Sequence, residues 1–142
     1  MCTAGSVVSE RAAVHSSAAH RVWIVEDEPA AAALASDLCV SCGAEPSVYR
    51  APLPFLTALR TAERPHAVVL DWRLEHELSA ALFLATRHRY PDLPVVYWTG
   101  SPGDALPIMI RQDARTVVVD KAAGSQAFES ALTSALEAAP GG

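Results

Sequence analysis

Four short apolar runs in this sequence each lead directly into residues that can do chemistry. The residues that follow them are Glu26 and Asp27 after 21–25, Asp71 after 67–70, Thr99 after 94–98, and Asp120 and Lys121 after 117–119. Runs of this length that are rich in β-branched residues are typical of strands buried on both faces. Because the carboxyl ends of parallel strands meet at one edge of a sheet, we expect acids, a hydroxyl and an amine to gather there.

The acids in this set predict a cation site. Two carboxylates about 4 Å apart repel each other by on the order of 4 kcal/mol at an effective dielectric constant of about 20. A cluster of Glu26, Asp27 and Asp71 therefore needs a cation unless one acid is protonated. Oxygen ligands suit Mg²⁺, whereas zinc prefers the histidine and thiolate ligands that these loops lack. With Thr99 and Lys121 to hold phosphoryl oxygens, the set describes phosphoryl transfer to an aspartate.

Amphipathic segments between the apolar runs predict the helices that position this site. Apolar residues recur at helical spacing in 29–42, 52–63, 78–90 and 125–138, and 45–49 reads as a weak strand. Segment 102–113 reads as a short or kinked helix, because Pro107 interrupts the pattern. The resulting order, βα repeated five times, predicts a doubly wound α/β domain with helices on both faces of a parallel sheet. Its site should lie at the switch point beyond the first and third strands.

Length and composition indicate one globular domain. The 142 residues can form one core and are too few for two ordinary domains, and 51% hydrophobic with 19% charged residues argues against a disordered chain. We expect residues 1–20 to be a flexible N-terminal tail, residues 21–139 to be the domain, and residues 140–142 to be a C-terminal tail.

Charge and hydropathy exclude several classes of partner. The net charge of −5 and the scattered positions of the 11 Lys and Arg residues argue against a surface for nucleic acid. No apolar run is long enough to span a membrane, and the first residues lack the apolar segment of a secretory signal. We therefore expect a cytoplasmic protein.

The cysteines and histidines do not form a second site in the sequence pattern. Cys39 and Cys42 make a C-x-x-C pair at the end of a predicted helix, and no second pair completes a set of four metal ligands. We interpret them as a buried thiol and a helix-end residue. The five histidines share no ligand spacing, so surface positions are expected for them.

The segments at the predicted strand ends resemble the receiver domain of two-component response regulators. The resemblance covers residues 21 to about 138 and rests on Val25-Glu26-Asp27-Glu28-Pro29, Leu70-Asp71-Trp72, Trp98-Thr99-Gly100 and Asp120-Lys121. Each motif is weak alone, and their order and spacing make the combination specific. The resemblance implies a flavodoxin-like three-layer sandwich of the CheY-like superfamily, with a parallel sheet in the strand order 2-1-3-4-5.

The resemblance also implies a role for each acid. Asp71 is the phosphoacceptor, which takes a phosphoryl group from a phosphohistidine on a sensor histidine kinase or from a phosphotransfer protein. Asp27 binds Mg²⁺ directly and Glu26 binds it through water. The carboxylate of Asp71 and the backbone carbonyl of Arg73 complete the protein ligands. The catalysis implied is limited to the domain's own phosphotransfer and dephosphorylation.

The resemblance further implies which residues bind the phosphoryl oxygens and where the signal passes. Thr99 and Lys121 bind phosphoryl oxygens, and the signal passes to an effector protein or a fused output domain, without direct contact with nucleic acid or membrane. The resemblance allows a homodimer through the fourth helix, fifth strand and fifth helix. The chain departs from the family pattern at Val118, where an aromatic residue usually stands, and at Ala122, where proline is usual.

Two other classes of function remain open at this stage. The chain is either a phosphorylatable receiver or a pseudo-receiver, an interaction module of the same fold that does not switch by phosphorylation. Val118 and Ala122 favour the second reading, and the intact set of acids, Thr99 and Lys121 favours the first. A small Mg²⁺-dependent phosphatase with Asp71 as nucleophile is disfavoured, because Arg73 stands where that chemistry needs a second acid.

Overall fold

The computed structural model describes residues 19–74, 77–100 and 106–137. The elements, in chain order, are β1 (His20–Val25), α1 (Pro29–Ser41), β2 (Ala44–Tyr49), α2 (Pro52–Thr61), β3 (Ala67–Leu70), β4 (Arg73–Leu74), β5 (Glu77–Leu78), α3 (Ala80–Arg89), β6 (Val95–Thr99), α4 (Ile108–Arg111), β7 (Thr116–Asp120), the 3₁₀ turn η3 (Lys121–Ala123) and α5 (Ser125–Glu137). Within these segments no helix combines the length and the apolar character needed to cross a bilayer.

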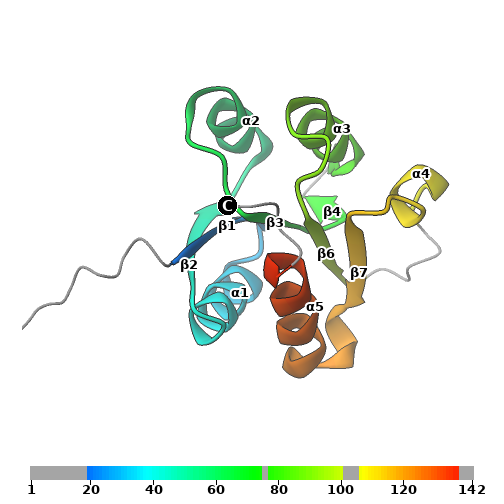
Figure 1. The fold of residues 1–142 in the computed structure, drawn as a ribbon. Coiled ribbons are helices and arrows are strands. Elements are labelled where there is room, and N and C mark those ends of the chain that lie inside the picture. Colours follow the sequence, from blue (N-terminus) through cyan, green and yellow to red (C-terminus); the bar gives the residue numbers. More distant parts are fainter. Residues whose placement is uncertain (1–18, 75–76, 101–105, 138–142) are drawn as a thin grey trace, which may run out of the picture.

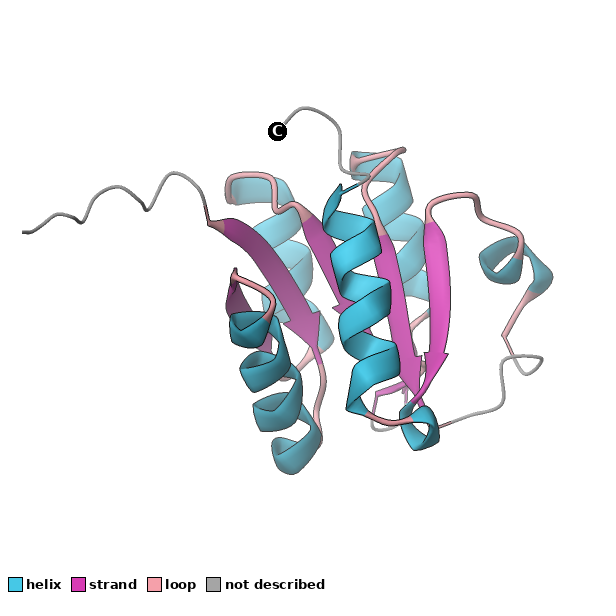
Figure 2. Ribbon diagram, turned by 60° about the horizontal axis from the view of Figure 1, so that its bottom comes forward, coloured by secondary structure: helices cyan, strands magenta, loops and turns pink. Residues whose placement is uncertain are grey.

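Five parallel strands form the central sheet, in the order β2-β1-β3-β6-β7. Counted along the chain, these strands have the order 2-1-3-4-5, so the predicted doubly wound α/β fold is confirmed. Helices α1 and α5 cover one face of the sheet, α2 and α3 cover the other, and α4 lies beyond the β7 edge (Figure 1). This three-layer arrangement brings the carboxyl ends of the strands to a single edge (Figure 2).

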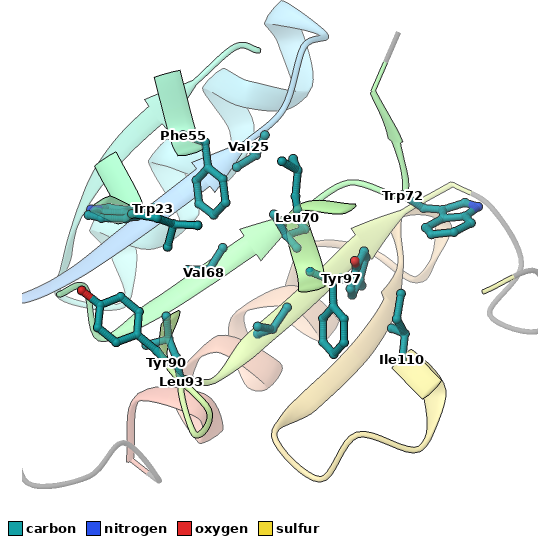
Figure 3. Packing of buried hydrophobic residues seen from close by; sticks show 14 of the residues in the cluster. Trp23, Val25, Phe55, Val68, Leu70, Trp72, Tyr90, Leu93, Tyr97 and Ile110 are labelled. Carbon is teal, nitrogen blue, oxygen red and sulfur yellow. The ribbon is translucent and has the colours of Figure 1, made fainter. Parts of the chain in front are cut away.

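The core consists of two clusters, one on each face of the sheet. Alternate residues of a strand point to opposite faces, so Trp23 packs under α2 and α3 while its neighbour Ile24 packs under α1 and α5. Figure 3 shows the first cluster, in which Phe55 lies beside Trp23, and Trp72 lies beside Tyr97. All four residues of β3 are buried, as expected for a central parallel strand.

The segment between β3 and α3 differs from the sequence prediction. Between β3 and α3 the chain forms a short antiparallel ribbon, β4 with β5, where only a loop was expected. Because Leu78 pairs with Arg73 in this ribbon, α3 begins at Ala80 rather than at residue 78. Helix α4 is a single turn that follows Pro107, in agreement with the predicted interruption. Residues 102–105, which we had assigned to the start of this helix, lie outside the described segments.

His66 joins the beginnings of two neighbouring strands instead of taking a surface role. The backbone N–H of Arg21, in β1, donates to His66 Nδ1 (2.9 Å), and the N–H of His66, next to β3, donates to the carbonyl of Arg21 (2.8 Å). Nδ1 can accept this bond only when it carries no proton. Burial, together with the positive charge of Arg21, lowers the pKa of His66 below its usual value.

A lowered histidine pKa makes stability depend on pH in a defined direction. The unfolded chain binds the proton more readily, so the free energy of unfolding should be highest above the ordinary histidine pKa of 6.5 and fall as the pH drops towards the lowered value. Urea denaturation between about pH 8 and pH 5 measures this slope. His66→Asn keeps an acceptor near the Nδ1 position without titrating, and it should flatten the curve. His88→Asn, at an exposed position of α3, should leave it unchanged. Equal slopes in wild type and His66→Asn would contradict this assignment.

Candidate functional site

Strand register explains why acids that are far apart in the sequence become neighbours. Val25 at the end of β1 is paired with Leu70 at the end of β3, so the next residues, Glu26 and Asp71, leave adjacent strands side by side. The N–H of Asp71 also donates to the carbonyl of Val25 (3.3 Å). These two loops diverge at the switch point of the sheet, where the sequence predicted the site.

The structure brings together the three acids that the sequence singled out. One carboxylate oxygen from each of Glu26, Asp27 and Asp71 lies within 4.8 Å of the others, and among the described residues no other group of three or more Asp, Glu, His or Cys side chains converges in this way. Glu26 is 1% exposed and Asp71 is 7% exposed, whereas Asp27 is half-buried. The oxygens of a six-coordinate Mg²⁺ lie up to about 4 Å apart, so a small movement would let this donor set hold such an ion.

Lys121 lies against two of these acids. Its Nζ is 3.0 Å from Glu26 Oε1 and 3.6 Å from Asp71 Oδ2, and its side chain is 26% exposed. We expected the acids to require a metal ion unless one is protonated, and this expectation is incomplete. The chain itself supplies one cation to the cluster. Lys121 is not a solvated charge, and it lies where it can reach a group bound to Asp71.

One lysine does not neutralise the cluster, as the electrostatics of Glu26 show. Burial raises the pKa of Glu26 above its usual value, the hydrogen bond from Lys121 opposes this, and the nearby charge of Asp71 adds to the rise. The N–H of Glu28 gives Glu26 Oε2 a further partner at 3.3 Å. Lys121 contacts two of the three clustered acids, so an additional hard cation would stabilise the ionised forms of the cluster.

The other predicted residues take positions around this cluster. Thr99 is 1% exposed and ends β6, paired with Asp120 of β7, so its hydroxyl belongs to the same edge of the sheet. Arg73 begins β4, two residues after Asp71. The roles of the Thr99 hydroxyl and of the Arg73 carbonyl stay predictions. Val118 is half-buried in β7 and packs against the first core cluster.

Sequence reasoning missed one neighbour of the site, Trp98. The Nζ of Lys121 lies 5.2 Å from the centroid of its ring, which is close enough for a cation–π interaction. The pattern of two strands brings these residues close together but does not determine their contact. Thr99 at the end of β6 pairs with Asp120 at the end of the adjacent strand β7. Trp98 comes directly before Thr99, and Lys121 comes directly after Asp120.

The cysteines have the structural roles that the sequence indicated. Cys39 is fully buried in α1, and burial raises the pKa of its thiol to about 12. Cys42 is the half-buried C-cap of the same helix. A thiol with a pKa as high as that of Cys39 stays protonated and unreactive at neutral pH.

No protein-family model matches the sequence, and no curated protein sequence matches it. Similar solved structures do exist, and the three named below are each less than 25% identical to this chain. One is a response regulator receiver protein from Sinorhizobium medicae WSM419, with a TM-score of 0.74, 17% identity, and coverage of 87% of this chain and 98% of that one. Another is the N-terminal domain of a response regulator/sensory box/GGDEF 3-domain protein from Carboxydothermus hydrogenoformans (TM-score 0.72, 22% identity, 82% and 94% covered). A third is the chemotaxis response regulator CheY4 of Vibrio cholerae (TM-score 0.72, 16% identity, 83% and 99% covered). The chain therefore has the fold of response-regulator receiver domains.

Proposed function

We propose that the chain is a two-component response-regulator receiver that accepts a phosphoryl group on Asp71 from a histidine kinase, with Mg²⁺, and signals through protein contacts. One observation carries this proposal. At the switch point of a receiver fold, Asp71 stands beside two further carboxylates and 3.6 Å from the ammonium group of Lys121. A nucleophilic carboxylate, a set of oxygen donors and a fixed positive charge are the groups that phosphoryl transfer to an aspartate needs.

In this proposal the donor set fits Mg²⁺ because it consists of oxygen atoms alone. Asp27 and Asp71 would hold the ion directly, Glu26 would hold it through water, and the carbonyl of Arg73 would add a fourth protein ligand. When bound, Mg²⁺ supplies positive charge between the acids and the incoming phosphoryl group.

The chain's own residues perform the remaining work. A carboxylate oxygen of Asp71 attacks the phosphorus atom, an O–P bond forms, and the P–N bond to the donor's imidazole breaks, with the leaving nitrogen taking up a proton. The Nζ of Lys121 then binds one phosphoryl oxygen, and the Thr99 hydroxyl donates to another. The buried position of Asp71 limits the access of water to the acyl phosphate.

We also propose partners and a compartment for this receiver. The phosphoryl donor is a sensor histidine kinase or a phosphotransfer protein in the cytoplasm, and the receiver of the signal is an effector protein or an output domain in the same polypeptide. The similar domain from Carboxydothermus hydrogenoformans belongs to a three-domain protein, which supports the second arrangement. The fourth helix, fifth strand and fifth helix of such folds, here α4, β7 and α5, are the surface that we assign to a homodimer.

A pseudo-receiver that does not switch by phosphorylation is the second candidate. One observation favours it: Val118, not an aromatic residue, occupies the position in β7 three residues before Lys121. A small β-branched side chain packed against the core cannot rotate as an aromatic ring does. If this reading is correct, the acids would remain a static cluster held by Lys121.

Incubation with a small phosphodonor separates the two candidates. In Mg²⁺ with acetyl phosphate or phosphoramidate, we expect the intact mass to increase by one phosphoryl group, and EDTA to prevent the increase. Borohydride reduction of the acyl phosphate, followed by peptide mass spectrometry, should place the modification on Asp71. An unchanged mass with every donor tested would reject the receiver and favour the pseudo-receiver.

Magnesium alone should stabilise the folded protein. A ligand that binds only the native state adds RT ln(1 + [L]/Kd), which is about 2.7 kcal/mol at a hundred times Kd and corresponds to several degrees in Tm. Thermal unfolding with increasing Mg²⁺ measures this gain. Glu26→Gln should reduce the gain because it removes one of the clustered charges. Glu45→Gln, on an exposed position of β2, should retain it. A Tm that does not respond to Mg²⁺ would count against the metal site.

A further inference from the structure

We propose that Trp98 is a positioning residue, whose ring holds Lys121 within reach of Asp71 while a metal ion occupies the acids. This inference rests on the proposed receiver function and deepens it. It assigns to this chain an uncharged partner for its phosphoryl-binding lysine, in addition to the two acidic ones.

Lys121 is placed between acids and an aromatic face. Its Nζ is 3.0 Å from Glu26 and 3.6 Å from Asp71, and it lies 5.2 Å from the centroid of the Trp98 ring. A distance below about 6 Å to an indole face is the geometry of a cation–π interaction, and tryptophan is the strongest natural partner for it.

The ring of Trp98 is fixed and cannot follow the lysine. Trp98 is 4% exposed in β6, and its ring packs on Phe128 of α5, with centroids 4.9 Å apart. Phe128 is itself fully buried. The indole N–H is buried and forms no hydrogen bond within the described residues. What Trp98 offers to Lys121 is therefore the face of its ring, at a constant position.

The two kinds of partner respond differently to a metal ion. When a divalent cation binds Glu26 and Asp71, their negative charge is neutralised, and the ion repels the ammonium group of Lys121. The indole face carries no net charge, so its attraction for Lys121 persists. Without it, Lys121 would be free to turn towards solvent at the stage when its charge is needed beside the phosphoryl group. A cation–π contact at a partly buried site corresponds to a rate effect of roughly 3- to 30-fold.

A pair of substitutions separates the ring face from simple packing. Trp98→Phe keeps an aromatic face, and Trp98→Leu removes it. At saturating Mg²⁺, we expect Trp98→Leu to take up phosphoryl groups from acetyl phosphate roughly 3- to 30-fold more slowly than wild type, and Trp98→Phe to lie between them. Trp23→Leu is the matched control, because Trp23 is also 4% exposed but packs on Phe55, on the other face of the sheet. Rates are compared per folded molecule, and the control should match wild type.

A second measurement does not depend on phosphorylation. Lys121 is the only lysine among the 142 residues, so ¹³C-labelled lysine gives the signals of one side chain in an NMR spectrum. Its methylene signals should be shifted upfield by the ring of Trp98 in both the absence and the presence of Mg²⁺. In Trp98→Leu this shift should be lost.

The two measurements decide the proposal separately from the receiver function. Lysine signals that move to their free positions when Mg²⁺ is added would overturn the role of Trp98, and so would equal rates for Trp98→Leu and wild type. If wild type takes up no phosphoryl group, the proposed function fails, and the lysine signals in Mg²⁺ still decide whether Trp98 holds Lys121.

Discussion

Replacing Asp71 with Asn is expected to abolish phosphoryl incorporation from acetyl phosphate, to below about a thousandth of the wild-type rate. The side-chain amide has nearly the same shape as the carboxylate, so the loop after β3 should keep its structure. The amide nitrogen is not a nucleophile towards phosphorus, and the amide oxygen lacks the negative charge that attacks it. Intact-mass measurement over time, in saturating Mg²⁺, gives the rate directly.

The control for this substitution is Asp37→Asn, which changes the same functional groups at an exposed position of α1. It should incorporate phosphoryl groups at the wild-type rate. Thermal unfolding of both variants in metal-free buffer verifies that they are folded. Phosphorylation that survives in Asp71→Asn would show that another acid accepts the group, with the half-buried Asp27 of the same cluster as the next candidate, and the assignment of Asp71 would then be wrong.

The sequence predicted the sheet and the convergence of its acids because both follow from the spacing of apolar residues and from the burial of the central strands. The four residues of β3 are buried on both faces of the sheet, so the strand is a continuous apolar run that can be recognised in the sequence. The charged residue that follows this run marks the end of the strand. Once the strands are parallel and neighbouring, the register of β1 with β3 places Glu26 beside Asp71 without further information. The convergence of the acids is a consequence of topology.

The features that the sequence did not predict depend on contacts between segments. Strands β4 and β5 have two residues each, which is too few to show the alternation of apolar and polar residues that is typical of a strand. We therefore predicted a loop there. The place of Lys121 between the acids and Trp98 depends on where its long side chain turns after β7, and the strand pattern does not determine a rotamer. His66 likewise becomes an acceptor for Arg21 only because β1 and β3 pair.

The second large effect is expected at Lys121, and it has opposite signs for two measurements. Lys121→Met should slow phosphoryl uptake at Asp71 by about a hundredfold, because a fixed positive charge at the phosphoryl oxygens is lost. The same change should tighten Mg²⁺ binding by about three- to tenfold, because it removes the ammonium group that competes with the ion for Glu26 and Asp71 in the wild-type protein. Titration of Mg²⁺ by thermal shift or tryptophan emission gives the affinity, and intact mass gives the rate.

The opposed signs identify the role of the lysine. A residue that only stabilises the fold would, when removed, weaken metal binding and phosphorylation together. Lys121→Arg tests the charge separately from the shape: it should restore the competition with Mg²⁺, and it should recover only part of the rate, since a planar guanidinium presents its donors in a different geometry from an ammonium group. In the role we assign to Lys121, the metal ion displaces its ammonium group from the acids, and the ammonium group then binds the phosphoryl group. A Lys121→Met protein that binds Mg²⁺ more weakly, or that takes up phosphoryl groups at the wild-type rate, would contradict this role.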